Sequence, residues 1–94
     1  MPVRQTARFL DELSKILLFI AEDNLDAALR FQDDLELKLQ TLPLFPYRCR
    51  QSHKSDDPQV RDLIFRGYVI PYRINQEKER IEVLGIFSEN RWGP

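Results

Sequence analysis

Arginine and aromatic side chains in the last third of the chain are the residues best suited to contact an anionic ligand or a protein partner. Arg61, Arg73 and Arg91 alternate with apolar residues, and Trp92 directly follows the last of them. Guanidinium groups bind phosphate, aromatic rings stack on bases, and both residue types dominate the centres of protein interfaces. We therefore expect Arg61, Arg73, Arg91 and Trp92 to bind the target of this protein. The alternative is that the arginines only form the solvent-facing side of a sheet.

Proton-transfer chemistry has little support among the residue types. His53 is the sole histidine and Cys49 the sole cysteine, and nothing in the sequence orients them as a base and a nucleophile. Cleavage of RNA without a metal needs a general acid and a general base besides its cations. Glu82 and Glu89 are available, but the sequence indicates a raised pKa for neither. We expect a binding protein rather than an enzyme.

The sequence contains no motif for a metal or a cofactor, and we expect neither. One histidine and one cysteine cannot supply the ligands of a zinc site, and three ungrouped glycines form no phosphate-binding loop. A lone cysteine cannot form an internal disulfide, and no apolar run approaches the roughly 20 residues of a membrane helix. The formal net charge of −1 does not indicate direct nucleic-acid binding. A cytoplasmic protein without membrane association is therefore expected.

The arginines lie in three short runs of alternating apolar and polar residues, which predict three β-strands within residues 61–92. The turns between the runs are short, so neighbouring strands must be antiparallel. We expect the second strand to present four side chains on one face: Tyr68, Ile70, Tyr72 and Ile74. The third strand should present another four on one face: Ile81, Val83, Gly85 and Phe87. Pro71 cannot donate a backbone hydrogen bond, so the second strand must lie at an edge or have a gap in its pairing.

Two amphipathic helices precede the strands. Apolar residues at helical spacing predict a first helix from an N-cap at Thr6 to a break at Asp23–Asn24. The second helix starts near Leu25 and stops at Pro43, because proline lacks the N–H that the helix needs. The short link makes the two helices an antiparallel hairpin, whose apolar stripes the sheet must cover. We predict a single α+β domain over residues 1–94, with the hairpin on a mainly antiparallel, twisted sheet of about four strands.

The link between the helices and the strands, residues 44–59, shows no period. It contains Pro46, Pro58 and a polar, basic stretch from Arg48 to Lys54. Loops of this length without structure of their own are uncommon and are often functional or mobile.

This order of elements resembles the RelE/ParE superfamily of bacterial type II toxins, also described as plasmid-stabilisation proteins. The resemblance covers nearly the whole chain and rests on the order and spacing of short segments. These are residues 19–24 (FIAEDN), 27–31 (AALRF), 42–46 (LPLFP), 60–63 (VRDL), 67–74 (GYVIPYRI) and 81–92 (IEVLGIFSENRW). The helix segment FIAEDN and the tyrosine-centred strand look more like the ParE-like branch than the RelE-like branch.

Three positions depart from the pattern of the family. Val69 stands where many members have an arginine, and Ser88 stands where many have the histidine of a His-x-x-Arg ending that is completed here by Arg91. Pro71 replaces the usual β-branched residue. The first two changes remove a phosphate-binding cation and a proton carrier that a ribonuclease would use. They favour protein binding over mRNA cleavage.

The resemblance implies a toxin that inhibits bacterial growth by binding an essential target, with DNA gyrase favoured, and that a cognate antitoxin neutralises. Operator DNA would be bound only indirectly, through the antitoxin, and the antitoxin-binding residues are not assigned. One alternative is a ribosome-dependent mRNA endoribonuclease of the RelE type, in which Arg61, Arg73 and Arg91 would bind phosphate. Another is a non-toxic module that only binds the antitoxin.

Overall fold

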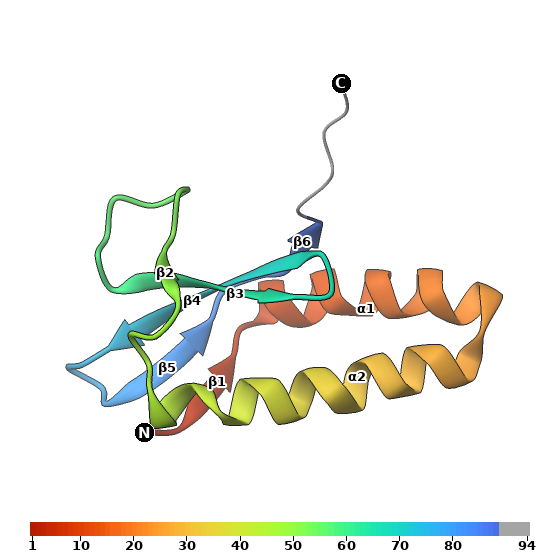
Figure 1. Ribbon diagram of the computed structural model, residues 1–94, viewed down its shortest axis with the longest axis horizontal. Helices are drawn as coiled ribbons and strands as arrows, with labels where there is room; N and C mark the ends of the chain where they lie inside the picture. The colour runs from red at the N-terminus through yellow and green to blue at the C-terminus, as the bar shows by residue number, and fades with distance from the viewer. Residues whose placement is uncertain (89–94) are drawn as a thin grey trace.

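Two antiparallel helices lie against one face of a twisted sheet in the computed structural model, which describes residues 1–88 (Figure 1). Helix α1 spans Ala7–Asp23 and helix α2 spans Leu25–Gln40, so a single residue, Asn24, separates them. The predicted helical hairpin and the α+β fold class are confirmed. Within residues 1–88, no helix is both long enough and apolar enough to cross a membrane.

Short polar side chains set the ends of both helices. The Oγ1 of Thr6 accepts a hydrogen bond from the backbone N–H of Phe9 at 3.2 Å, which confirms the predicted N-cap of α1. Asn24 closes α1 by donating its N–H to the carbonyl of Ile20 at 2.9 Å. The same residue caps α2, because its Oδ1 accepts the N–H of Ala27 at 3.0 Å. This double use of Asn24 allows the helices to follow one another almost without a loop.

Over residues 1–88, the sheet has six strands rather than the roughly four that were predicted. Its order is β1-β5-β4-β3-β2, and β6 also pairs with β4. The strands are Val3–Gln5 (β1), Arg50–Gln51 (β2), Val60–Phe65 (β3), Tyr68–Asn75 (β4), Arg80–Val83 (β5) and Phe87–Ser88 (β6). All pairs are antiparallel except β1 with β5, which is parallel. The predicted meander corresponds to β3, β4 and β5, whereas β1, β2 and β6 are too short to show a period in the sequence.

The core lies between the helices and the sheet. Tyr68, Ile70, Tyr72 and Ile74 share the helix-facing side of β4 as predicted, and the last three are at most 1% exposed. Both helices, the neighbouring strands and the segments that follow α2 and β5 complete this core with buried side chains: Phe9, Leu13, Phe31, Leu35, Leu39, Leu42, Leu63, Phe65, Ile81, Val83 and Ile86.

Pro71 lies in a central strand, at a gap in its pairing. On one side, β4 pairs with β6 through Tyr68 and Val69, and with β5 from Tyr72 onward, so Pro71 falls between the two paired stretches. Its carbonyl accepts the N–H of Leu84 at 2.8 Å. The strand therefore tolerates the missing proline donor because nothing at that position requires it.

A one-residue bulge separates β5 from β6 and overturns one predicted face. Tyr72 pairs with Val83 and Val69 pairs with Phe87, so one strand advances four residues while β4 advances three. The extra residue moves Phe87 to the face opposite Ile81 and Val83. The prediction that these side chains share a face is therefore wrong for Phe87.

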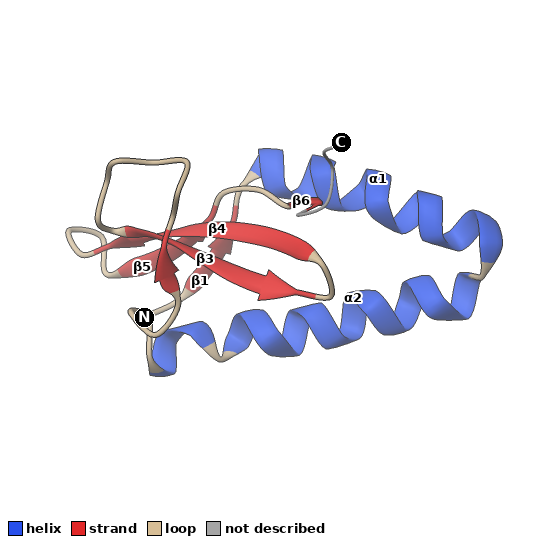
Figure 2. Ribbon diagram, turned by 45° about the horizontal axis from the view of Figure 1, so that its top comes forward, coloured by secondary structure: helices blue, strands red, loops and turns tan. Residues whose placement is uncertain are grey.

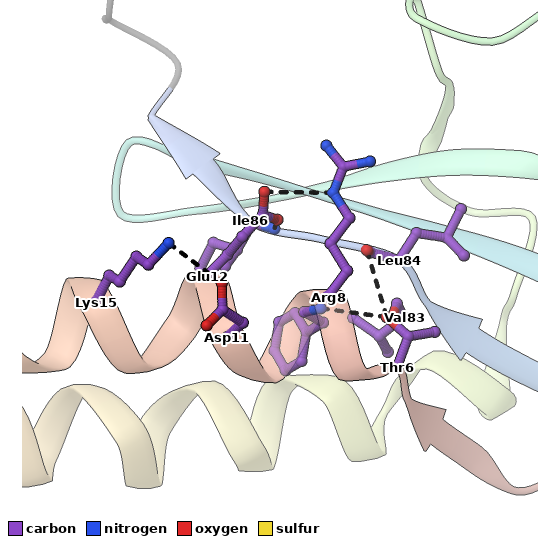
Figure 3. Close-up of polar contacts among 9 residues, drawn as sticks. Thr6, Arg8, Asp11, Glu12, Lys15, Val83, Leu84 and Ile86 are labelled. Carbon is purple, nitrogen blue, oxygen red and sulfur yellow. Dashed lines mark hydrogen bonds and ion pairs between the residues drawn. The ribbon is translucent and has the colours of Figure 1, made fainter.

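Glu12 of α1 stabilises this bulge. Its Oε1 accepts the backbone N–H of Ile86 at 3.0 Å (Figure 3). Gly85 lies beside the carboxylate, and a Cβ atom at that position would be 2.6 Å from the same oxygen. The hydroxyl of Thr6 donates to the carbonyl of Val83 at 2.8 Å, so the first turns of α1 hold both ends of the bulge.

Residues 44–59 are anchored although they show no sequence period. The hydroxyl oxygen of Ser52 accepts the N–H of Lys54 at 3.2 Å, and that of Ser55 accepts the N–H of Asp57 at 3.1 Å. Strand β2 pairs with β3 in the middle of the segment. The basic stretch from Arg48 to Lys54 is therefore tied to the edge of the sheet.

Candidate functional site

The two predicted target-binding arginines that the structure describes lie on opposite faces of the sheet. Arg61 of β3 pairs with Tyr72, whose side chain belongs to the core, whereas Arg73 of β4 pairs with Glu82. Cross-strand partners share a face, so Arg61 lies on the helix side and Arg73 on the outer side. The two guanidinium groups therefore do not converge on one phosphate or carboxylate. The alternative, in which the arginines only form the solvent-facing side of a sheet, fits Arg73 but not Arg61.

Arg61 stabilises the segment that leads into β2. Its Nη1 donates to the carbonyl of Cys49 at 3.2 Å, and its guanidinium carbon lies 5.1 Å from the centroid of the Tyr47 ring, within cation–π distance. The Tyr47 hydroxyl in turn donates to Gln59 Oε1 at 2.6 Å. The Nε of Arg61 is buried and has no hydrogen-bond partner within residues 1–88. Arg61 thus supports residues 47–49 instead of projecting from the sheet.

Arg73 is accessible to a partner on the outer face. Its side chain is 46% exposed, and its Nε lies 3.5 Å from an oxygen of Asp57, which is itself 37% exposed. Ion pairs this exposed contribute little to stability, so a partner can replace this one at small cost. Arg91 and Trp92, the other two predicted target-binding residues, lie outside the described residues.

The acid–base groups opposite these arginines on the neighbouring strands, Tyr72 and Glu82, are poorly suited to proton transfer at neutral pH. A hydrogen bond from Arg80 Nε to Glu82 Oε2, at 2.9 Å, holds the pKa of Glu82 below its usual value of 4.5. Burial raises the pKa of Tyr72 well above its usual value, and the Tyr72 hydroxyl donates to the carbonyl of Pro46 at 2.6 Å. Ser88 is exposed at the position where the resembling family often has histidine. Neither Glu82 nor Tyr72 has the pKa near neutrality that a general acid or base needs.

The helical hairpin projects past the end of the sheet (Figure 2), and apolar side chains at this end are exposed. Leu18 is 67%, Phe19 73% and Leu25 63% exposed. A hollow of about 580 Å³ at the hairpin link is lined by six residues: Phe19, Ile20, Glu22, Asp23, Asn24 and Ala27. We call these residues, with Leu18 and Leu25, the hairpin-end surface. Exposed apolar patches of this kind are typical of protein–protein interaction sites.

A second hollow, of about 650 Å³, runs along the edge of β3 next to the end of α2. Its lining comes from α2, the 3₁₀ turn η1 (Leu42–Leu44), the following loop, β2 and β3: Lys38, Thr41, Leu42, Leu44, Phe45, Arg48, Cys49, Arg50, Asp62, Leu63 and Ile64. Leu44 and Phe45 are 68% and 65% exposed. We call this hollow the β3-edge cleft.

Neither surface could be located from the sequence, because periodicity indicates which face of an element is apolar and not where a neighbouring element ends. One signal for the β3-edge cleft was nevertheless present. Leu44 and Phe45 form an apolar pair between Pro43 and Pro46, directly after a helix, where no period requires them to be buried.

Comparison with known proteins identifies one family. Residues 3–91 match the family model described as ParE toxin of type II toxin-antitoxin system, parDE. The chain is also similar to a solved structure of the chromosomal ParDE TA system from P. aeruginosa. That similarity has a TM-score of 0.73 at 20% sequence identity and covers 94% of this chain and 95% of that chain. At this identity it supports the fold alone. No curated protein matches the chain.

Proposed function

We propose that this chain, which belongs to the ParE toxin family of type II toxin–antitoxin systems, inhibits bacterial growth by binding an essential target and is neutralised by a cognate antitoxin protein. DNA gyrase is the target we favour, because residues 19–24 and 67–74 resemble the ParE-like branch. The site of action would then be the cytoplasm, and operator DNA would be reached only through the antitoxin.

Uncovered apolar surface is the observation that carries this proposal. In a domain of 94 residues, the hairpin-end surface and the β3-edge cleft both leave large side chains in contact with water, with Phe19 73% and Phe45 65% exposed. A partner protein would bury these side chains on binding. We expect the isolated toxin to self-associate or to be poorly soluble, and coexpression with the antitoxin to keep it in solution. A stable monomer at high concentration would contradict this expectation.

The positions of the arginines, the identity of residue 88 and the pKa of Glu82 favour protein binding over cleavage of RNA. Arg61 and Arg73 point to different sides of the sheet, and a ribonuclease needs cations that converge on one phosphate. Ser88 stands where a proton carrier would be, and the lowered pKa of Glu82 keeps that carboxyl ionised. These features disfavour the RelE-type endoribonuclease as a description of this chain.

Pulse labelling after induction of the toxin alone separates the target classes. If DNA synthesis stops first, with a DNA-damage response, the gyrase target is supported, and the purified protein should inhibit DNA supercoiling by gyrase in vitro. If protein synthesis stops first, the endoribonuclease alternative replaces it. If growth continues although folded protein accumulates, the chain is a non-toxic antitoxin-binding module.

Arg73 provides a residue-level test of target binding. Arg73→Ala should weaken growth arrest and gyrase inhibition, because it removes an accessible cation from the outer face. The matched control is Arg30→Ala, which removes an exposed arginine from α2, on the other side of the molecule from Arg73. Equal toxicity of the two variants would remove Arg73 from the target-binding site, without bearing on antitoxin binding.

A further inference from the structure

Strand β3 has an open edge beyond the end of β2. The β3–β4 hairpin closes through Arg66–Gly67, both with positive φ (50° and 82°), so the flanking pair Phe65 and Tyr68 exchanges backbone hydrogen bonds. By alternation, Asp62 and Ile64 direct their backbone groups away from β4. Strand β2 pairs with that edge at Arg61 and Asp62 but does not extend along β3 as far as Ile64. Within residues 1–88, no strand pairs with the outward N–H and carbonyl of Ile64.

Apolar side chains flank this open edge. Ile64 is 41% exposed, and Leu44 and Phe45 stand across the β3-edge cleft with about two thirds of their surface exposed. Leu42 and Leu63 belong to the same cleft and are buried, at 4% and 7% exposure. A chain lying along the edge would therefore find unpaired backbone groups and an apolar wall side by side.

The rim of the β3-edge cleft is positively charged. Lys38 and Arg48 are exposed and form no ion pair with another of residues 1–88. Arg50 already pairs with the buried Asp62 at 3.5 Å, and Asp62 is the only carboxylate among the described residues that line the cleft. A second copy of this chain placed edge to edge would bring the same cations together. The charge therefore favours an acidic partner over self-association.

We propose that the β3-edge cleft binds an extended, acidic and apolar segment of the antitoxin, which adds a strand beside β3. The backbone of this segment pairs with Ile64, its apolar side chains pack against Leu44 and Phe45, and its carboxylates pair with Lys38 and Arg48. Strand addition obtains affinity from main-chain hydrogen bonds and specificity from the flanking pockets. This inference rests on the proposed function, since it describes how the toxin binds its antitoxin.

Amide hydrogen exchange followed by NMR tests the added strand directly. In the free toxin, the amide of Ile64 should exchange rapidly, while those of Leu63 and Phe65, which face β4, exchange slowly. On binding the full-length antitoxin, exchange at Ile64 should slow by about tenfold or more, because its N–H gains a partner. An amide at Ile64 that remains fast in the saturated complex would overturn strand addition.

Charge reversal tests the acidic character of the partner. Lys38→Glu/Arg48→Glu should weaken antitoxin binding by about tenfold or more, since two attractive contacts become repulsive, and should flatten its dependence on salt. The matched control is Arg4→Glu/Lys78→Glu, which changes the charge equally at exposed positions outside the cleft. Circular dichroism establishes that each variant is folded before its affinity is measured.

The outcomes separate the two proposals. If wild-type toxin binds the antitoxin but the cleft and control variants bind equally well, the antitoxin does not use this cleft and the inference fails while the proposed function stands. If wild-type toxin does not bind the antitoxin at all, the proposed function itself fails.

Discussion

Replacing Gly85 with alanine should destabilise the protein through Glu12, a residue of α1 that is distant in the chain. The φ angle of Gly85 lies outside the left-handed region, so alanine adds no backbone strain there. The added methyl group would instead lie 2.6 Å from Glu12 Oε1, which is closer than non-bonded carbon and oxygen atoms approach. Either the carboxylate or the bulge must move.

The expected loss in the free energy of unfolding follows from the hydrogen bond that this movement breaks. Glu12 Oε1 accepts the N–H of Ile86 at 3.0 Å, and Ile86 is only 2% exposed, so water cannot readily replace the carboxylate. Hydrogen bonds to charged groups contribute about 1.5–3 kcal/mol, and a buried unpaired donor costs a similar amount. We expect Gly85→Ala to lower the free energy of unfolding by about 2 kcal/mol.

Measuring Gly85→Ala in two variants of Glu12 tests whether its effect acts through the carboxylate. In Glu12→Ala, the hydrogen bond is already absent and the obstructing oxygen is gone, leaving Arg8 Nε at 3.9 Å as the nearest atom named around the new methyl. In that background, Gly85→Ala should lower the free energy of unfolding by less than about 0.5 kcal/mol. The difference from the roughly 2 kcal/mol expected in the wild type is a coupling energy of about 1.5 kcal/mol between the two residues. In Glu12→Gln, the side chain keeps its volume, so Gly85→Ala should cost nearly as much as in the wild type.

Urea unfolding followed by circular dichroism gives the free energies, measured at several protein concentrations because apolar surface is exposed. Additive effects of Gly85→Ala and Glu12→Ala would refute the reasoning, because they would show that the alanine methyl does not act through the carboxylate. An equally small effect of Gly85→Ala in all three backgrounds would show that the bulge relaxes freely.

Substitutions at three other residues test contacts that fix the fold. Asn24→Ala should cost about 1 kcal/mol in urea unfolding, whereas Asn24→Ser, which keeps a capping oxygen, should cost little; equal costs would exclude the cap as the cause. Tyr72→Phe removes the buried hydroxyl bonded to Pro46 and should cost about 1–2 kcal/mol, and an unchanged stability would show that this bond is replaced by water. Because the folded pKa of Glu82 lies below its usual value of 4.5, its stabilisation is present above that pH and is lost as the pH falls. Glu82→Gln should therefore lower the melting temperature near pH 7 and lower it less at about pH 3; an equal effect at both would refute this linkage.

The two helices and strand β4 were predictable from the sequence, because each is long enough to show its own pattern of apolar residues. The helical hairpin and the buried face of β4, with Tyr72 at its centre, follow from spacing alone. Strand β3 is different, since Leu63, Ile64 and Phe65 are consecutive apolar residues and leave the direction of Arg61 undecided. The cross-strand register, a tertiary property, settles that Arg61 shares the face of Tyr72.

The bulge and the candidate site depend on contacts between distant parts of the chain. Glu12 and Ile86 are 74 residues apart, and no local pattern connects them. Their hydrogen bond stabilises the bulge that places Phe87 on the outer face, which alternation alone could not show. The β3-edge cleft similarly arises because β2 has only two residues and leaves Ile64 uncovered. Strand length and register, rather than apolar pattern, create the open edge.

The β3-edge cleft and Arg73 lie on different parts of the sheet, so mutations should separate antitoxin binding from toxicity. Arg73 lies on the outer face of β4, whereas Lys38 and Arg48 line the cleft beside β3, so an antitoxin segment in the cleft would leave Arg73 uncovered. Lys38→Glu/Arg48→Glu should therefore still arrest growth and should do so even when the antitoxin is coexpressed at a level that rescues the wild type. Arg4→Glu/Lys78→Glu should remain neutralised. If the cleft variant is instead folded but harmless, the target also uses this cleft, and the antitoxin neutralises the toxin by competing for one shared surface.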